Sequence, residues 1–127
     1  MKTFAFIRKI VHNYQNPHQN YHYCGYVGII DDSKIPLSIQ ASNDLCDKEA
    51  LDFKIEIHGG ITFDCKLNSM TPIIPLTEIP QNWHQYRCIG FDLAHDDDVQ
   101  NNVNTDYNFC VSETFHLKEQ IENLIKI

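Results

Sequence analysis

Apolar and polar residues alternate in several short segments, which predicts β-strands over the first three quarters of the chain. Apolar residues occupy every second position in 53–57 and again in 63–67, on either side of Gly59 and Gly60. A period of two is typical of a strand with one buried face. Segment 23–30 is rich in the β-branched and aromatic residues that strands favour. Segment 86–93 places Ile89, Phe91 and Leu93 on one face of a strand. Segment 4–11 is mostly apolar and fits either a strand or a short helix.

The two glycines predict a hairpin between the alternating segments. A two-residue turn would pair Ile57 with Thr62 and mix apolar with polar side chains on one face of the sheet. A three-residue connection over 59–61 pairs Ile57 with Phe63 and keeps the apolar side chains together, so we predict this register. The opposite face would then carry four polar side chains close to the turn: His58, Thr62, Glu56 and Asp64.

From Asp106 or Asn108 onwards the pattern becomes that of a helix. Either residue can cap its start, Glu113 falls in its first turns near the polar connection, and Glu122 and Lys126 are spaced as an i,i+4 ion pair. A buried stripe at helical spacing is predicted for Cys110, Thr114, Leu117, Ile121 and Leu124.

Three less regular segments separate these elements. Segment 13–23 is polar and contains Pro17, so we expect a loop or an exposed edge. Segment 43–51 weakly favours a short helix, and 70–81 contains three prolines and should be an irregular loop. Together the elements predict a single α+β domain over residues 1–127, with a mainly antiparallel sheet of four to five strands and a C-terminal helix packed on one face.

Composition and charge narrow the class of protein. The chain of 127 residues is 43% hydrophobic and 21% charged, as expected for a globular protein. No apolar run approaches the roughly 20 residues of a membrane span, and Arg8 and Lys9 interrupt the N-terminal apolar stretch, so we expect a cytoplasmic protein without a membrane partner. The net charge of −7, with scattered Lys and Arg, argues against binding to a nucleic acid polymer. Five cysteines without a C-x-x-C pair predict reduced core thiols.

His58, Asp92 and His95 are the main candidates for chemistry. Each lies at the end of an apolar segment and close to a glycine, which allows a tight turn or a close approach to a ligand. If the chain turns helically after Asp92, then His95 points the same way three residues later. The neighbouring glycines Gly59, Gly60 and Gly90, together with Thr62 and Glu113, are the candidate ligand-binding residues.

These side chains predict either a metal centre or an acid–base site. Two imidazoles and a carboxylate suit a divalent ion such as Zn, Mn or Fe, and Asp98, Asp64 or Glu113 can complete the set. In a catalytic site, His58 and His95 would be ligands or the general base, Asp92 a ligand or an orienting group, and Thr62 a hydrogen-bond donor to the substrate.

Other interpretations of the same residues remain open. In a purely structural one, His58 caps a hairpin, Asp92 ends a strand and His95 begins a surface loop. Cys88 or Cys65 could instead serve as a nucleophile, although no cysteine-protease signature surrounds them. The run 96–98 is expected to be a solvated turn, because it lacks the alternating oxygen ligands of a calcium loop. The histidines and tyrosines of 12–23 form a polar loop or a second binding surface.

Three blocks of sequence add a resemblance to a known family. They are C-G-Y-V-G at 24–28, H-G-G-I-T-F at 58–63 and G-F-D-L-A-H-D-D-D at 90–98. With a closing helix that carries an acid, Glu113, near its start, the chain resembles a family of small uncharacterised bacteriophage and prophage proteins. The resemblance implies that His58, Thr62, Asp92, His95 and Asp98 form one site. Asp96 and Asp97 depart from the small residues of the family pattern, which can alter the loop or its ligand.

The leading hypothesis is a phage-type His/Asp pocket that binds a small polar ligand, such as a nucleotide, or a divalent metal, with metal-assisted hydrolysis as the reaction. The alternative is a binding protein without turnover, which sequesters a ligand or inhibits a host protein. The phage resemblance implies that such a protein counters a host defence.

Overall fold

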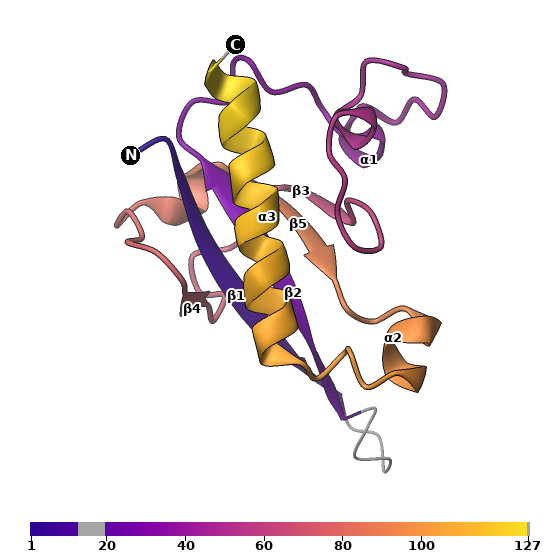
Figure 1. The fold of residues 1–127 in the computed structure, drawn as a ribbon. Helices are drawn as coiled ribbons and strands as arrows, with labels where there is room; N and C mark the ends of the chain where they lie inside the picture. The colour runs from indigo at the N-terminus through magenta and orange to yellow at the C-terminus, as the bar shows by residue number, and fades with distance from the viewer. Residues whose placement is uncertain (13–19, 127) are drawn as a thin grey trace.

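The structure, a computed structural model, describes residues 1–12 and 20–126. In this part of the chain a five-stranded sheet lies under one long helix, as Figure 1 shows. Every neighbouring pair of strands is antiparallel, in the order β3-β5-β2-β1-β4. The strands are β1 (Thr3–Val11), β2 (Tyr21–Ile29), β3 (Phe63–Cys65), β4 (Ile74–Pro75) and β5 (Arg87–Asp92). The predicted α+β architecture is confirmed.

β1 and β2 form the centre of the sheet. They pair along their full length, from Thr3 opposite Ile29 to Val11 opposite Tyr21. Segment 4–11 is therefore a strand, and the last residues of the predicted 13–23 loop belong to β2. Residues 13–19 of that segment, with His18 and Tyr14, lie outside the described residues.

The helix α3 (Tyr107–Lys126) covers one face of the sheet. Asp106 caps it by accepting a hydrogen bond from the Phe109 amide at 3.0 Å, and four residues of the predicted stripe are buried: Cys110, Thr114, Leu117 and Ile121. Gly25 lets the helix approach β2, since a Cβ there would lie 2.1 Å from the Thr114 hydroxyl oxygen. The ion pair of Glu122 is made with Lys118 at 2.7 Å, one turn before the expected Lys126.

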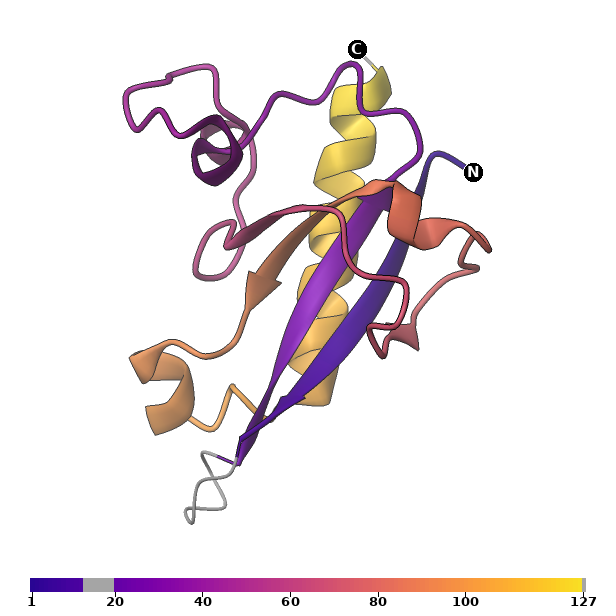
Figure 2. The same ribbon diagram turned by 180° about the vertical axis from the view of Figure 1, so that it is seen from behind.

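The opposite face of the sheet carries an aromatic cluster. Phe4, Phe6 and Tyr26 are buried there, and Trp83 packs edge-on against Phe6 with ring centroids 5.4 Å apart. Figure 2 shows this face, with β4 and the short helix η3 (Trp83–Gln85) at its margin. The predicted irregular loop 70–81 thus contains a two-residue edge strand, where Pro75 is tolerated because one side of an edge strand needs no ladder hydrogen bond.

The predicted hairpin around Gly59 and Gly60 is wrong. Residues before the glycines form the 3-10 helix η2 (Leu51–Phe53) followed by irregular chain, and β3 pairs with β5. The Ile55 amide donates to the Leu51 carbonyl at 3.1 Å, so these two residues are buried one turn apart while Phe53 is 63% exposed. Apolar side chains here follow a helical turn, which a short alternating pattern does not distinguish from a strand.

Two further local predictions need correction. The short helix expected over 43–51 lies earlier, as α1 (Ile39–Ser42), because Ser38 caps its start and Asn43 ends it in the left-handed region at φ 58°. Reduced core thiols are predicted for all five cysteines, but Cys46 and Cys65 are exposed, the latter at the sheet edge. Cys24, Cys88 and Cys110 are buried, and all five cysteines are free thiols.

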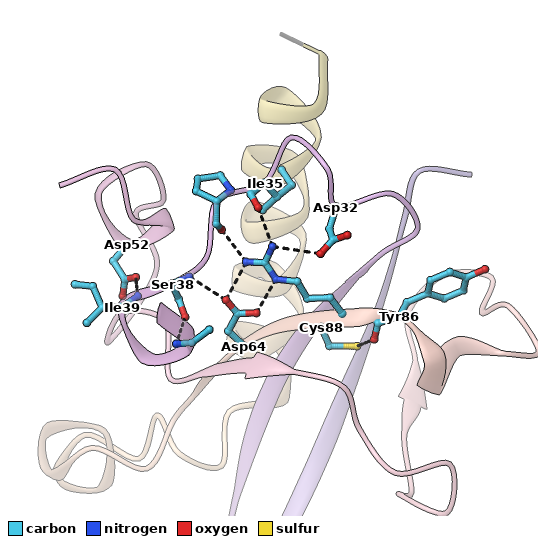
Figure 3. Close-up of polar contacts among 11 residues, drawn as sticks. Asp32, Ile35, Ser38, Ile39, Asp52, Asp64, Tyr86 and Cys88 are labelled. Carbon is cyan, nitrogen blue, oxygen red and sulfur yellow. Dashed lines mark hydrogen bonds and ion pairs between the residues drawn. The ribbon is translucent and has the colours of Figure 1, made fainter. Parts of the chain in front are cut away.

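Asp64 is held in a buried ion pair, away from His58. Arg87 on β5 donates from Nε and Nη2 to the two Asp64 oxygens at 2.6 and 2.8 Å (Figure 3). The same guanidinium donates to the carbonyls of Ile35 and Pro36, and Asp64 also accepts from the Ser38 amide at 2.9 Å. The pair therefore ties β3, β5 and the segment before α1 together.

None of the helices in the described part of the chain combines the length and the apolar composition that a membrane crossing requires.

Candidate functional site

His58 and Asp98 form the central contact of the candidate site. The Nε2 atom of His58 lies 2.5 Å from Oδ1 of Asp98, although forty residues separate them in the chain. The Asp98 side chain is only 3% exposed, whereas the His58 side chain is 33% exposed. A buried carboxylate that bonds one imidazole nitrogen fixes the orientation and the tautomer of the ring. The ring's other nitrogen, Nδ1, makes no hydrogen bond within the described residues.

The second oxygen of Asp98 holds the start of the short helix α2 (Asp96–Gln100). Its Oδ2 accepts from the backbone amide of His95, the N-cap residue, at 3.3 Å. The run 96–98 is thus the first turn of a helix and not a solvated turn. Because both oxygens of Asp98 are engaged, this residue links α2 to the loop that carries His58.

The absence of a side chain at Gly59 leaves room for the His95 ring beside His58. A turn closed by the Gly60 amide and the Ile57 carbonyl at 3.0 Å puts Gly59 at φ +71°, in the left-handed region that favours glycine. A Cβ at Gly59 would lie 2.2 Å from His95 Nε2, so a larger residue here would have to displace the His95 ring. Gly60 is also left-handed, at φ +79°, but faces open space.

Asp92 and His95 form a second, looser pair. Their side chains approach to 3.5 Å between Oδ1 and Nε2 without the alignment of a hydrogen bond, and His95 Nε2 is buried without a partner. Asp92 Oδ1 accepts from the Ala94 amide at 3.0 Å. The rings of His58 and His95 lie 6.4 Å apart, so the two pairs are neighbours.

A cavity of about 290 Å³ opens beside His58. This is close to the lower end of the range for ligand pockets, about 300 Å³, so it suits a small molecule. Its lining residues come from the His58 loop and from α3: Glu56, Ile57, His58, Glu113 and His116. Among the predicted site residues, His58 and Glu113 line this cavity.

Glu113 presents an unsatisfied acceptor at the cavity. Its Oε2 atom is buried and makes no hydrogen bond, and His116 Nδ1 lies 3.6 Å away. Sequence reasoning missed His116, although its spacing of three residues from Glu113 on one helix places both on the same side. It also missed Phe109, whose ring meets His58 edge-on at 5.1 Å.

Thr62 and Gly90 contribute to the packing and hydrogen bonding of the sheet. The Thr62 amide donates to the Gly90 carbonyl at 3.0 Å, which aligns the chain entering β3 with β5. A Cβ at Gly90 would lie 2.6 Å from the Tyr26 ring. Neither residue lines the cavity beside His58.

No group of three or more His, Cys, Asp or Glu side chains in the described residues is arranged to hold a metal ion. The predicted set of His58, Asp92, His95 and Asp98 instead forms the two pairs described above. A metal bound here would compete with Asp98 for His58 Nε2 or use the free Nδ1 atom.

The buried cysteines are poorly suited to act as nucleophiles. Burial raises the pKa of Cys88 to about 12, and the neighbouring Cys65 adds to the rise. Burial likewise raises the pKa of Cys24 to about 11. Since the thiolate is the reactive form, these groups are protonated thiols at neutral pH.

Comparisons with protein-family models, with curated proteins and with solved structures found no match to the chain.

Proposed function

We propose that the cavity beside His58 binds a small polar molecule and that His58 exchanges a proton with it. The observation that carries this proposal is the pairing of a partly exposed imidazole with a buried carboxylate at the wall of a cavity. Such a pair is the orienting half of many general acid–base sites.

His58 would act through Nδ1. With Nε2–H donated to Asp98, the lone pair of Nδ1 is available to take a proton from a bound hydroxyl or a water molecule. The imidazolium formed in this step is stabilised by the Asp98 carboxylate at 2.5 Å and later returns the proton to the leaving group. Hydrolysis of a small ester or amide is the reaction class that fits these roles.

A divalent ion such as Zn, Mn or Fe would assist the same reaction. Bound at the free nitrogen of His58 or near Asp92 and His95, it would polarise the ligand or lower the pKa of a water molecule. The cytoplasm of a phage-infected bacterium is the proposed setting, because the chain resembles phage proteins.

The second candidate is binding without turnover, as in sequestration of a ligand or inhibition of a host protein. The buried Oε2 of Glu113 favours it, because an unsatisfied acceptor retains a hydrogen-bond donor without any chemical step. The two candidates share one cavity and differ in the fate of the ligand.

One set of experiments tests both candidate functions, the acid–base reaction and binding without turnover. In protein labelled with 15N-histidine, NMR should show the Nε2–H tautomer of His58, and Asp98→Asn should disturb it. With a panel of nucleotides, esters and amides, His58→Gln should lower any turnover about 100-fold or more, while His84→Gln, which does not alter the cavity lining, should leave it unchanged.

The outcomes separate the candidates. Turnover that survives His58→Gln contradicts the catalytic role, and loss of turnover after chelation shows that a metal assists. A ligand that native mass spectrometry finds bound and that is recovered intact supports sequestration. If no probe from the panel binds or reacts, the proposed function is wrong.

A further inference from the structure

The charge of the cavity lining restricts the charge of the ligand that can bind there. Its titratable residues are two glutamates and two histidines, and no Lys or Arg lines it. The lining charge therefore runs from −2 with neutral imidazoles to zero with both protonated. Asp98, directly behind His58, adds a further carboxylate. As long as both glutamates are ionised, the lining carries no net positive charge.

The two glutamates of the lining come from different elements. Glu113 projects from α3, whereas Glu56 belongs to the loop before His58. That loop is fixed to α3 through Gln120, which accepts from the Glu56 amide at 2.7 Å and donates to the Glu56 carbonyl at 2.8 Å. The Glu56 carboxylate has no ion-pair partner in the described part of the chain.

We propose that the cavity takes a small organic cation, namely a protonated primary amine or a guanidinium group on a short carbon chain. This inference rests on the proposed function, that the cavity binds a small polar molecule. An ammonium group supplies three donors and no acceptor, which matches the carboxylates of Glu113 and Glu56, since neither accepts a hydrogen bond within the described residues. Ile57 provides an apolar wall for the carbon chain.

Anionic ligands fit this lining poorly. A phosphate or carboxylate would bring acceptor oxygens against the carboxylates of Glu56 and Glu113, and only the two imidazoles could donate to it. Like charges at such short range oppose binding. Among the nucleotide and metal ligands expected from the sequence, the phosphate-bearing ones are therefore disfavoured.

An NMR titration of the full chain tests the inference. The probes are n-butylammonium chloride, a short lysine peptide, inorganic phosphate, adenosine monophosphate and zinc chloride, and the signals followed are the His58 ring and the Gln120 side-chain amide. Butylammonium should shift both signals in a saturable manner, while phosphate and the nucleotide should not. A lysine peptide that binds more tightly than butylammonium would identify the source of the amine as a protein side chain rather than a free molecule.

Two variants of α3 provide the matched comparison. Glu113→Gln keeps the shape of the side chain and should weaken butylammonium binding about tenfold or more, as expected for loss of a charged hydrogen-bond partner. Glu119→Gln removes the same charge from an exposed position outside the lining and should leave the affinity within about twofold.

The results distinguish failure of the inference from failure of the proposed function. If phosphate, the nucleotide or zinc shifts the signals and butylammonium does not, the cavity binds a ligand but the cation inference is wrong. Equal weakening by Glu113→Gln and Glu119→Gln shows nonspecific attraction to an acidic protein and overturns the inference. If none of the probes shifts either signal, both proposals fail.

Discussion

Removing the Arg87 side chain from its contact with Asp64 should destabilise the fold severely. The side chains of Arg87 and Asp64 are 10% and 2% exposed, and two hydrogen bonds of 2.6 and 2.8 Å join them. Arg87→Met would leave a buried carboxylate whose remaining partner is the Ser38 amide at 2.9 Å. Breaking a buried ion pair on one side costs about 3 to 5 kcal/mol, because the remaining charge stays desolvated.

Urea unfolding followed by circular dichroism measures this loss. With a slope of about 1.5 kcal/mol per molar urea, the expected loss lowers the midpoint by about 2 to 3 M. Lys118→Met is the matched control, since it also replaces a cation by methionine but breaks the more exposed pair with Glu122, which contributes at most about 1 kcal/mol. The double variant Arg87→Met with Asp64→Leu should lose less than the sum of the two single variants, because no unpaired charge is then buried.

Either of two results would contradict a stabilising role for the buried pair of Arg87 and Asp64. One is an unfolding free energy for Arg87→Met within about 1 kcal/mol of the wild type, as expected only for a surface pair. The other is additivity of the two single variants, which would mean that the side chains stabilise the fold independently.

Three further predictions concern the thiols, the turn and a buried imidazole. Alkylation of the native protein with iodoacetamide should modify the exposed Cys46 and Cys65, whereas the three buried thiols should react only after unfolding, as mass spectrometry would show. Gly59→Ala should lower the free energy of unfolding by at least about 1 to 2 kcal/mol and displace His95, whose ring occupies the space of the new methyl group; an unchanged melting temperature would contradict this. Burial lowers the pKa of His22 below its usual 6.5, with a nearby imidazole adding to the effect. The unfolded chain therefore binds more protons as the pH falls past 6.5, so the stability contributed by His22 is complete above that pH and is lost below it. His22→Gln should flatten this decline in stability at acidic pH.

The sequence patterns that predicted correctly are those with a long, repeated signal. The apolar stripe of α3 extends over several turns, and Asp106 marks its start, so both its position and its buried face could be predicted. β2 is dense in aromatic and β-branched residues and β5 alternates apolar with other residues, and both lie inside the sheet. The alternation over 53–57 covers too few residues to separate a strand from a turn of helix, and the burial of Leu51 and Ile55 decided between them.

The pattern of apolar and polar residues did not predict which side chains far apart in the chain contact one another. Asp64 was grouped with the polar residues around His58, but Arg87 holds it on another part of the sheet. Nothing in the spacing shows that His58 pairs with Asp98 rather than with Asp92, because the choice depends on how α2 turns after β5. The cavity likewise depends on the packing of α3 against the His58 loop.

In the structure, Gly59 and Gly60 shape a turn rather than a ligand-binding backbone. A glycine beside a histidine suggested a backbone that approaches a ligand, yet the space left free at Gly59 is filled by the ring of His95. The motif at 58–60 therefore specifies the geometry of a turn, and this turn brings His58 to Asp98. A site is indicated instead by two groups whose hydrogen bonding is incomplete, the Nδ1 atom of His58 and the Oε2 atom of Glu113. Both residues line the same cavity. A ligand that satisfied the Glu113 carboxylate would lie in the same cavity as the imidazole, so binding and proton transfer would depend on one another, and a variant at either residue should alter both.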